Sequence, residues 1–289
     1  MRVCLRCGQG HESEDWSCPA CHHVPTRHLN FVSFAPEMQA HEVHFRPECY
    51  SVLAEVEQQN FWFQARSQLL IWALKAHFPT AQSLLEIGCG TGFVLNALHI
   101  AFPTLKLAGS EIFSEGLRYA STRAPQAMLF QMDARSIPFK DEFDIVGAFD
   151  VLEHIAEDDL VLQQMHQSVK PGGGIMVTVP QHPWLWSEYD TVDGHCRRYT
   201  RADLCQKVRA AGFQVVRVSS FVALLLPLLL VMRRMHTTNC SDSTKELRIN
   251  SVVNGGLGTI MGVERWLIRA GFSFPMGGSL LLIARKPKA

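Results

Sequence analysis

The 289-residue sequence predicts an α/β fold, in which a parallel sheet is covered by helices on both faces and preceded by a small metal-binding module. Two observations carry this prediction. From about residue 61 onward, short apolar runs alternate with segments of helical periodicity, the pattern of consecutive βαβ units. Ahead of that point, two CxxC pairs stand in a stretch of fewer than about 40 residues, which can rarely build a stable core alone.

The N-terminal pairs are Cys4-Leu-Arg-Cys7 and Cys18-Pro-Ala-Cys21, with ten residues between them. This spacing brings four thiolates together for a tetrahedral Zn²⁺ ion, whose binding would supply much of the folding energy. We therefore expect a structural zinc ribbon in a module, with its linker, at 1–48; two redox-active pairs are the alternative. The module contains four arginines and six acidic residues, which argues against nucleic-acid binding.

Composition is that of a globular protein, with 47% hydrophobic and 19% charged residues and no net charge. The charge is divided unequally, because residues 1–196 carry 12 Lys/Arg against 23 Asp/Glu, whereas 197–289 carry 15 against 4. The basic C-terminal third suggests an anionic partner, such as the surface of an anionic membrane, or only a solvated basic face. No apolar stretch precedes Cys4, so we expect a cytoplasmic protein, with peripheral contact at the inner membrane face as a further option.

The core pattern begins with a buried strand at 83–87 and a helix at 93–101. We expect the remaining elements in the same alternation: strands at 105–110, 128–132, 143–149, 174–179 and 213–218, with helices at 114–123 and 158–169, the second ended by the Pro-Gly-Gly-Gly segment at 171–174. In such a fold, ligands bind at the carboxyl ends of the strands.

A glycine-rich loop with Gly88, Gly90 and Gly92 follows the first strand. Glu86 stands two residues before the first of these glycines. This spacing differs from the GxGxxG of nicotinamide and flavin enzymes, and the carboxylate would repel a pyrophosphate but attract the ammonium group of S-adenosylmethionine. Glu111 ends the second strand, where it would accept hydrogen bonds from ribose hydroxyls, and Asp133 ends the third, where it would accept the adenine amino group.

With these motifs, the sequence resembles the class I S-adenosylmethionine-dependent methyltransferases, in particular the bacterial type 11/12 group, over about residues 61–218. Two further segments carry the resemblance, FDVLEH at 149–154 and VKPGGG at 169–174. The resemblance implies a Rossmann-like seven-stranded sheet whose last strand is antiparallel, with Asp150 near the cofactor. It also implies a helical cap over 57–77, with Arg66 near the cofactor's carboxylate. Other expected cofactor contacts are Cys89, Ile112 and Ala134.

Methyl transfer needs no protein nucleophile, but a hydroxyl acceptor benefits from a base, and His154 and His195 follow the fourth and fifth strands. For each histidine, a packing role is the alternative. The loop between the fifth strand and the next helix is rich in aromatic and arginine side chains, which suits a substrate pocket. Its candidate substrate-binding residues are Trp184, Tyr189, Arg197, Arg198 and Tyr199; a lid that seals the core is the alternative.

An apolar and basic insertion at 221–278 separates the methyltransferase core at 49–220 from the last strand at 279–289. Its longest apolar run is too short to span a membrane but suits interfacial binding, a dimer contact or a substrate tunnel. The favoured function is therefore O-methylation of a small or lipid-like hydroxylated acceptor. Methylation of an rRNA base and a non-catalytic scaffold role are the alternatives.

Overall fold

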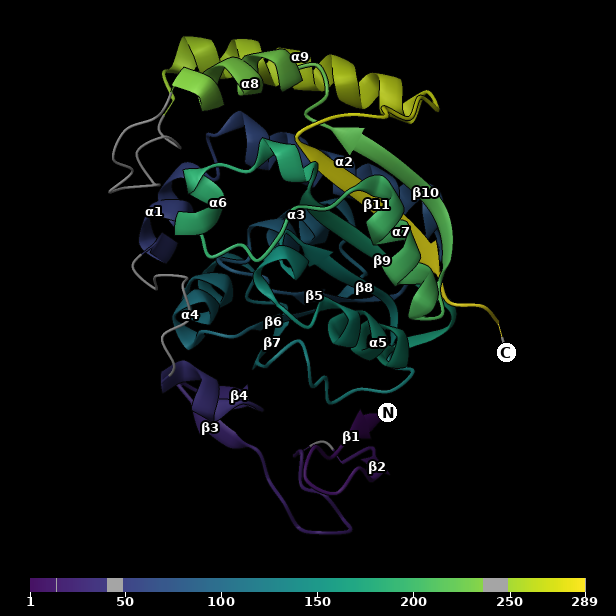
Figure 1. The fold of residues 1–289 in the computed structure, drawn as a ribbon. Coiled ribbons are helices and arrows are strands. Elements are labelled where there is room, and N and C mark those ends of the chain that lie inside the picture. The colour runs from purple at the N-terminus through teal and green to yellow at the C-terminus, as the bar shows by residue number, and fades with distance from the viewer. Residues whose placement is uncertain (14, 41–48, 236–248, 289) are drawn as a thin grey trace.

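The computed structural model describes residues 1–13, 15–40, 49–235 and 249–288. Its centre is one mixed sheet with strand order β10-β11-β9-β8-β5-β6-β7-β4-β3 (Figure 1). Seven of these strands form the predicted core: β5 (Ser83–Ile87), β6 (Lys106–Glu111), β7 (Met128–Gln131), β8 (Phe143–Phe149), β9 (Val169–Pro180), β10 (Gln214–Phe221) and β11 (Ser279–Arg285). Strands β5 to β9 pair in parallel, whereas β11 runs antiparallel to both of its neighbours. The predicted seven-stranded sheet with an antiparallel last strand is confirmed.

Strand β9 includes the Pro-Gly-Gly-Gly segment, but its continuous pairing begins where the sequence predicts. Helix α5 (Asp158–Ser168) ends at the expected place, and Val169 pairs with Phe143 of β8. The register then shifts, and continuous pairing with β8 and β11 starts at Gly174. A Cβ atom at Gly173 or Gly174 would lie 2.3 Å from a backbone oxygen of a neighbouring strand, so these glycines permit close strand packing.

Helices cover both faces of the sheet, as the alternating pattern predicts. Leu84 and Leu85 are adjacent and fully buried, yet belong to different apolar clusters because successive strand residues face opposite sides. One face packs against α2 (Phe61–His77), α3 (Phe93–Ala101), α4 (Ser114–Arg123) and α9 (Ser251–Arg269). The other packs against α5 and α7 (Arg201–Ala210). The two shorter helices are α1 (Cys49–Val56) and α6 (Glu188–Val192).

Two unpredicted strands from the N-terminal segment extend the sheet. After the small hairpin β1 (Arg2–Val3) and β2 (Gly10–His11), β3 (Thr26–His28) pairs with β4 (Phe31–Ser33), which lies parallel to β7. The ring of Trp16 makes edge-to-face contacts with Phe34 and Phe130, at centroid distances of 4.9 and 5.3 Å. The cysteine-rich module is therefore packed against the core (Figure 1).

Gln131, at the end of β7, joins this segment to the core through its buried side chain. Its Oε1 accepts hydrogen bonds from the Ser33 hydroxyl at 2.7 Å and the Ala35 N–H at 3.1 Å. Its Nε2 donates to the carbonyls of Ala35 and Ile112, at 2.8 and 2.9 Å. Every hydrogen-bonding position of this amide is used.

The C-terminal insertion contains α8 (Leu226–Met235) and α9, which lie together beside α2 (Figure 1). The buried carboxylate of Glu264 fixes α9 to the start of α8, because it accepts hydrogen bonds from the N–H groups of Val222, Ala223 and Leu224 at 2.6 to 2.8 Å. Asn254 accepts the N–H of Phe61 at 2.8 Å and so ties α9 to the start of α2. Among the described helices, none is long and apolar enough to cross a membrane.

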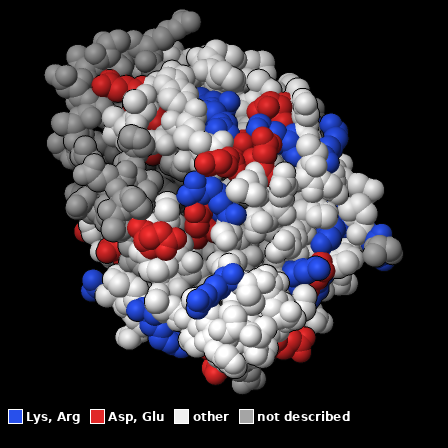
Figure 2. Space-filling view, turned by 60° about the horizontal axis from the view of Figure 1, so that its bottom comes forward, with Lys and Arg blue, Asp and Glu red and all other residues white. Residues whose placement is uncertain are grey.

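Charge does not gather by sign on the face shown in Figure 2. Lysine and arginine side chains alternate there with acidic ones, and the described residues form no continuous area of one sign. The unequal division of charge along the sequence is therefore not visible as a single patch on that face.

Candidate active site

A cavity of about 570 Å³ opens at the carboxyl ends of β5, β6, β7 and β8, where the fold predicts a ligand site. Eleven predicted residues line it: Arg66, Glu86, Gly88, Cys89, Gly90, Glu111, Ile112, Asp133, Ala134, Asp150 and His154. The sequence prediction and the geometry therefore select the same place.

The glycine-rich loop forms the floor of the cavity between β5 and α3. Its three glycines have φ angles of +66°, +52° and +76°, which residues with a Cβ atom rarely adopt. At Gly90, an added Cβ would meet no atom within 4 Å, so this position faces open space. At Gly92, it would lie 2.8 Å from the Cα atom of Ala120. Gly90 thus leaves room for a ligand, whereas Gly92 lets α3 pack against α4 without lining the cavity.

Glu86 lies on the cavity wall with its side chain almost completely buried. Its Oε2 atom has no hydrogen-bond partner among the described residues. Burial raises the pKa of this carboxyl well above its ordinary value, opposed by the positive charge of Arg66. A buried carboxylate oxygen without a partner is costly, so a cationic or donor group of a ligand would stabilise it.

Glu111 and Asp133 stand at the ends of β6 and β7, as predicted. The carboxylate of Glu111 accepts the N–H groups of Gly90 at 3.0 Å and Ile112 at 2.7 Å. Asp133 forms an ion pair with Arg135 at 2.8 Å. Both acids are held by local partners on the edge of the cavity.

Arg66 and Asp150 form a partly buried ion pair in the cavity wall. The guanidinium group of Arg66 lies over the Trp62 ring, 4.5 Å from its centroid, which fixes its direction. Asp150 has a φ of +59°, and its carboxylate also accepts a hydrogen bond from the Thr178 hydroxyl at 3.2 Å. The predicted helical cap over 57–77 thus contributes a cation to the cavity.

His154 and His195 approach each other although they are 41 residues apart. Their ring centroids are 4.6 Å apart and the ring planes are nearly perpendicular. His154 lines the cavity; burial, and then the charge of His195, lower its pKa to about 4. The Nδ1 atom of His195 lies 2.9 Å from the Oδ1 atom of Asp190.

The five candidate substrate-binding residues lie outside the cavity lining. Arg198 is buried and pairs with Asp190 at 2.6 Å, and the Tyr199 hydroxyl donates to Asp158 at 2.7 Å. Arg197 pairs with the same Asp158 at 2.6 Å, whereas Trp184 is 54% exposed. These contacts organise the loop, and for all five, Tyr189 included, a role in substrate binding stays a prediction.

Sequence reasoning missed the contribution of α1 to the cavity. Tyr50 and Leu53 on α1 line it, as does Glu57, which directly follows α1 and begins the predicted cap, and Tyr50 hydrogen-bonds Glu111. Glu57 accepts a hydrogen bond from the Thr91 hydroxyl at 2.5 Å and pairs with Arg123 on α4. No local motif distinguishes these residues, because their role depends on contacts far apart in the sequence.

The four N-terminal cysteines come together as predicted. Their sulfur atoms lie within 4.8 Å of one another, with Sγ distances of 3.7 Å from Cys4 to Cys21 and 3.6 Å from Cys7 to Cys18. The two knuckles have the same backbone turn, since Gly8 and His22 each donate to the carbonyl four residues earlier.

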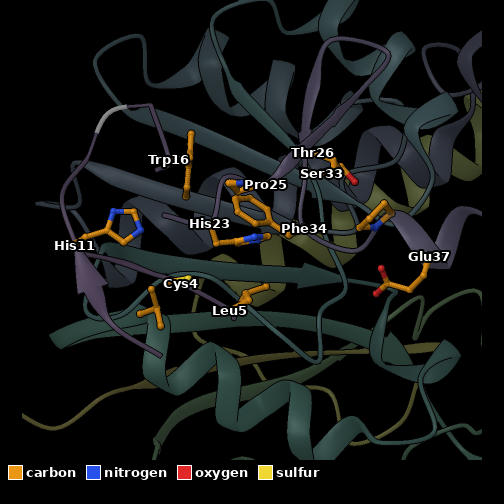
Figure 3. A pocket seen from close by; sticks show the side chains of 12 residues that line it. Cys4, Leu5, His11, Trp16, His23, Pro25, Thr26, Ser33, Phe34 and Glu37 are labelled. Atoms are coloured by element: carbon orange, nitrogen blue, oxygen red, sulfur yellow. The ribbon is translucent and has the colours of Figure 1, made fainter. Parts of the chain in front are cut away.

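A second, smaller cavity of about 240 Å³ lies between this cluster and the sheet (Figure 3). Trp16, His23 and Phe34 contribute to its lining. It is separate from the larger cavity and contains none of the residues predicted to bind the cofactor.

The fold and the cavity define a class I methyltransferase of the S-adenosylmethionine-binding type. The chain belongs to the methyltransferase domain family, whose model matches residues 56–218. It is 32% identical over 176 residues to a dTDP-3-amino-3,6-dideoxy-alpha-D-glucopyranose N,N-dimethyltransferase of Streptomyces fradiae, covering 60% of this chain and 63% of the relative.

A protein of Mycolicibacterium smegmatis named "Probable S-adenosylmethionine-dependent methyltransferase" is 26% identical over 161 residues, covering 55% of this chain and 61% of the relative. The chain thus spans about three fifths of the length of these curated relatives. Among solved structures, Haemonchus contortus phosphoethanolamine N-methyltransferase 2, in complex with S-adenosyl-L-methionine, shares the fold with a TM-score of 0.58 and 20% identity. That match covers 86% of this chain and 59% of the other.

Proposed function

We propose that the protein transfers a methyl group from S-adenosylmethionine to a small-molecule acceptor. The observation that carries the proposal is the buried, unpartnered carboxylate oxygen of Glu86 beside a glycine loop that leaves room for a ligand. The amino group of the cofactor would satisfy this oxygen, whereas a dinucleotide would bring its anionic pyrophosphate to the same loop.

The remaining acids match the other parts of the same cofactor. Glu111 would bind the ribose hydroxyls, Asp133 would accept the adenine amino group, and Arg66 would pair with the methionine carboxylate. When bound, the cofactor supplies an activated methyl group on a sulfonium. The chain's own task is to hold donor and acceptor in line and to keep water from the reacting centre.

We further propose that the acceptor reaches the cavity at its His154 end, where Asp193, Gly194 and Cys196 also line the wall. His154 and His195 would remove the proton from a hydroxyl acceptor, which favours O-methylation. The amino-sugar N,N-dimethyltransferase among the relatives favours a second candidate, methylation of an amino group on a small molecule. Both reactions need an unprotonated nucleophile at the same end of the cavity.

A lipid-like acceptor is supported by the outer face of α8 and α9. Eight large apolar side chains of the described parts of these helices are exposed: Leu228, Val231, Met232, Val252, Val253, Ile260, Val263 and Trp266. Arg269 follows at the end of α9. An apolar face with an adjacent cation suits contact with an anionic membrane.

Vesicle flotation tests this contact directly. Binding to anionic but not neutral vesicles should be weakened by Trp266→Ser, because Trp266 is 65% exposed, and unchanged by Trp184→Ser, a comparably exposed tryptophan elsewhere. Equal flotation of the two variants would exclude this face as the contact.

We also propose that Cys4, Cys7, Cys18 and Cys21 bind structural zinc. Four sulfurs within 4.8 Å of one another, in two knuckles of equal geometry, suit a closed tetrahedral site. The metal would stabilise a module whose described elements are four short strands and a 3-10 helix at Pro36–Ala40.

Calorimetry and labelled methyl transfer test the main proposal. The protein should bind S-adenosylmethionine and transfer label into the lipid or small-molecule fraction of a lysate. Label in RNA would revive the rRNA alternative, and binding without transfer to any fraction would support the scaffold alternative. Binding of NAD instead of S-adenosylmethionine would overturn the assignment.

A further inference from the structure

Three potential metal ligands meet beside the acceptor end of the cavity. Glu153 and His154 follow strand β8, and His195 belongs to the loop after α6. One ligand atom from each of these side chains lies within 4.8 Å of the other two. Apart from the four N-terminal cysteines, this is the one such group of three or more ligands among the residues that the structure describes.

Asp190 orients His195 in the way that a metal-binding histidine is commonly oriented. The carboxylate of Asp190 pairs with the guanidinium group of Arg198 at 2.6 Å and therefore acts as an acceptor. Its 2.9 Å contact with His195 makes Nδ1 of that ring the donor. Nε2 is then left with its lone pair, as in carboxylate–histidine–metal arrangements.

Glu153 provides an independent sign of a missing partner. Its side chain is 1% exposed, and its Oε2 atom has no hydrogen-bond partner among the described residues. A buried polar atom without a hydrogen-bond partner destabilises the folded chain. A cation between Glu153 and the two imidazoles would satisfy it.

The ligand set itself suits a transition-metal ion. Two imidazoles and one carboxylate are typical of sites for Zn²⁺ or Fe²⁺ that keep a coordination position open. Mg²⁺ and Ca²⁺ prefer oxygen ligands.

We propose that Glu153, His154 and His195 bind a divalent transition-metal ion whose open position receives the acceptor. This deepens the proposed function and rests on it for the acceptor's role. In this arrangement the two histidines would hold the ion instead of taking the proton themselves. A hydroxyl bound to the ion would release its proton to water, because the ion stabilises the resulting oxyanion. The oxygen lone pair then forms the C–O bond as the C–S bond breaks, and that electron pair stays on the sulfur.

Metal binding at the proposed site can be measured without an activity assay. The full chain, stripped with a chelator, is titrated with Co²⁺ and followed by absorption spectroscopy. The cysteine cluster gives intense thiolate-to-cobalt charge transfer, whereas the proposed site adds weaker visible bands without that transition. Glu153→Gln and His195→Asn should lose only the weaker bands, and His28→Asn, on an exposed strand, should keep both sets. Asp190→Asn should weaken the second binding step by about 10- to 100-fold.

The outcomes separate this proposal from the proposed function. Wild-type protein that binds the second metal and loses methyl transfer when that site is emptied supports the proposal. Full transfer with only the cysteine site filled would overturn it while leaving the proposed function intact. Absence of the weaker bands from wild-type protein that melts as a folded chain would also overturn it. Retention of the metal site without S-adenosylmethionine binding would instead refute the proposed function.

Discussion

Replacement of Glu86 by glutamine should lower the affinity for S-adenosylmethionine and raise the stability of the ligand-free protein. The cofactor's ammonium group would lose a charge-assisted hydrogen bond, worth about 1.5–3 kcal/mol. Since about 1.4 kcal/mol corresponds to a tenfold change in affinity, Kd for S-adenosylmethionine should rise roughly ten- to a hundredfold. Isothermal calorimetry measures this change, with the exposed Glu12→Gln as the matched control.

The ligand-free protein should become more stable in the same variant. The pKa of Glu86 in the folded state is raised above the ordinary value of about 4.5, so the folded chain resists an ionisation that the unfolded chain undergoes. The unfolding free energy of the wild type therefore falls as pH rises from about 4.5 through the raised folded pKa. Glutamine removes this loss, so the variant should melt higher at neutral pH.

A melting curve without ligand and a calorimetric titration at the same pH check both signs. Added S-adenosylmethionine should raise the melting temperature of the wild type more than that of the variant, because ligand stabilisation follows the ratio of concentration to Kd. Unchanged affinity in Glu86→Gln would refute the electrostatic reasoning, whatever the effect on stability.

Three further changes test other parts of the structure. Gly92→Ala should lower the unfolding free energy by about 1–3 kcal/mol, because its Cβ would overlap Ala120 at a positive φ; Gly255→Ala, with open space in helix α9, should leave the thermal melt unchanged or slightly higher. Cys18→Ser should abolish zinc binding, measured by a colorimetric chelator, and make the N-terminal module sensitive to protease; retained zinc would contradict the four-thiolate site. With a pKa of about 4, His154 acting as the base would set an acidic limb of the rate–pH profile near that value, and His154→Asn should lose this limb; a limb retained in the variant would contradict the role as base.

The cofactor half of the site was predictable because its residues follow consecutive strands. Glu86, Glu111 and Asp133 each stand at a strand's carboxyl end, and parallel pairing brings those ends to one edge of the sheet. Strand periodicity and glycine spacing are local signals, so the sequence alone carries them. The parallel pairing of the strands also explains why Glu86 lines the cavity.

The parts that were missed depend on contacts between distant segments. Strands β3 and β4 are each only three residues long and have no strong alternation of apolar and polar residues. Contacts of Trp16 and Gln131 fix β4 beside β7, and β3 pairs with β4. The places of Asp190 beside His195 and of Glu153 beside both histidines were not predicted either. No local sequence pattern indicates that α6 and the loop after it approach the end of β8. In each case, tertiary packing decides what local propensity leaves open.

The amide of Gln131 bears on how a shortened form of this protein would behave. A chain that starts near residue 49 would lack both Ser33 and Ala35, so three of the four hydrogen bonds of that amide would be broken. Its fourth bond reaches Ile112, directly after the acid expected to hold the ribose, and removal of β4 would also expose an open edge on β7. Weak donor binding by such a fragment would therefore report a damaged core rather than a regulatory role of the cysteine module.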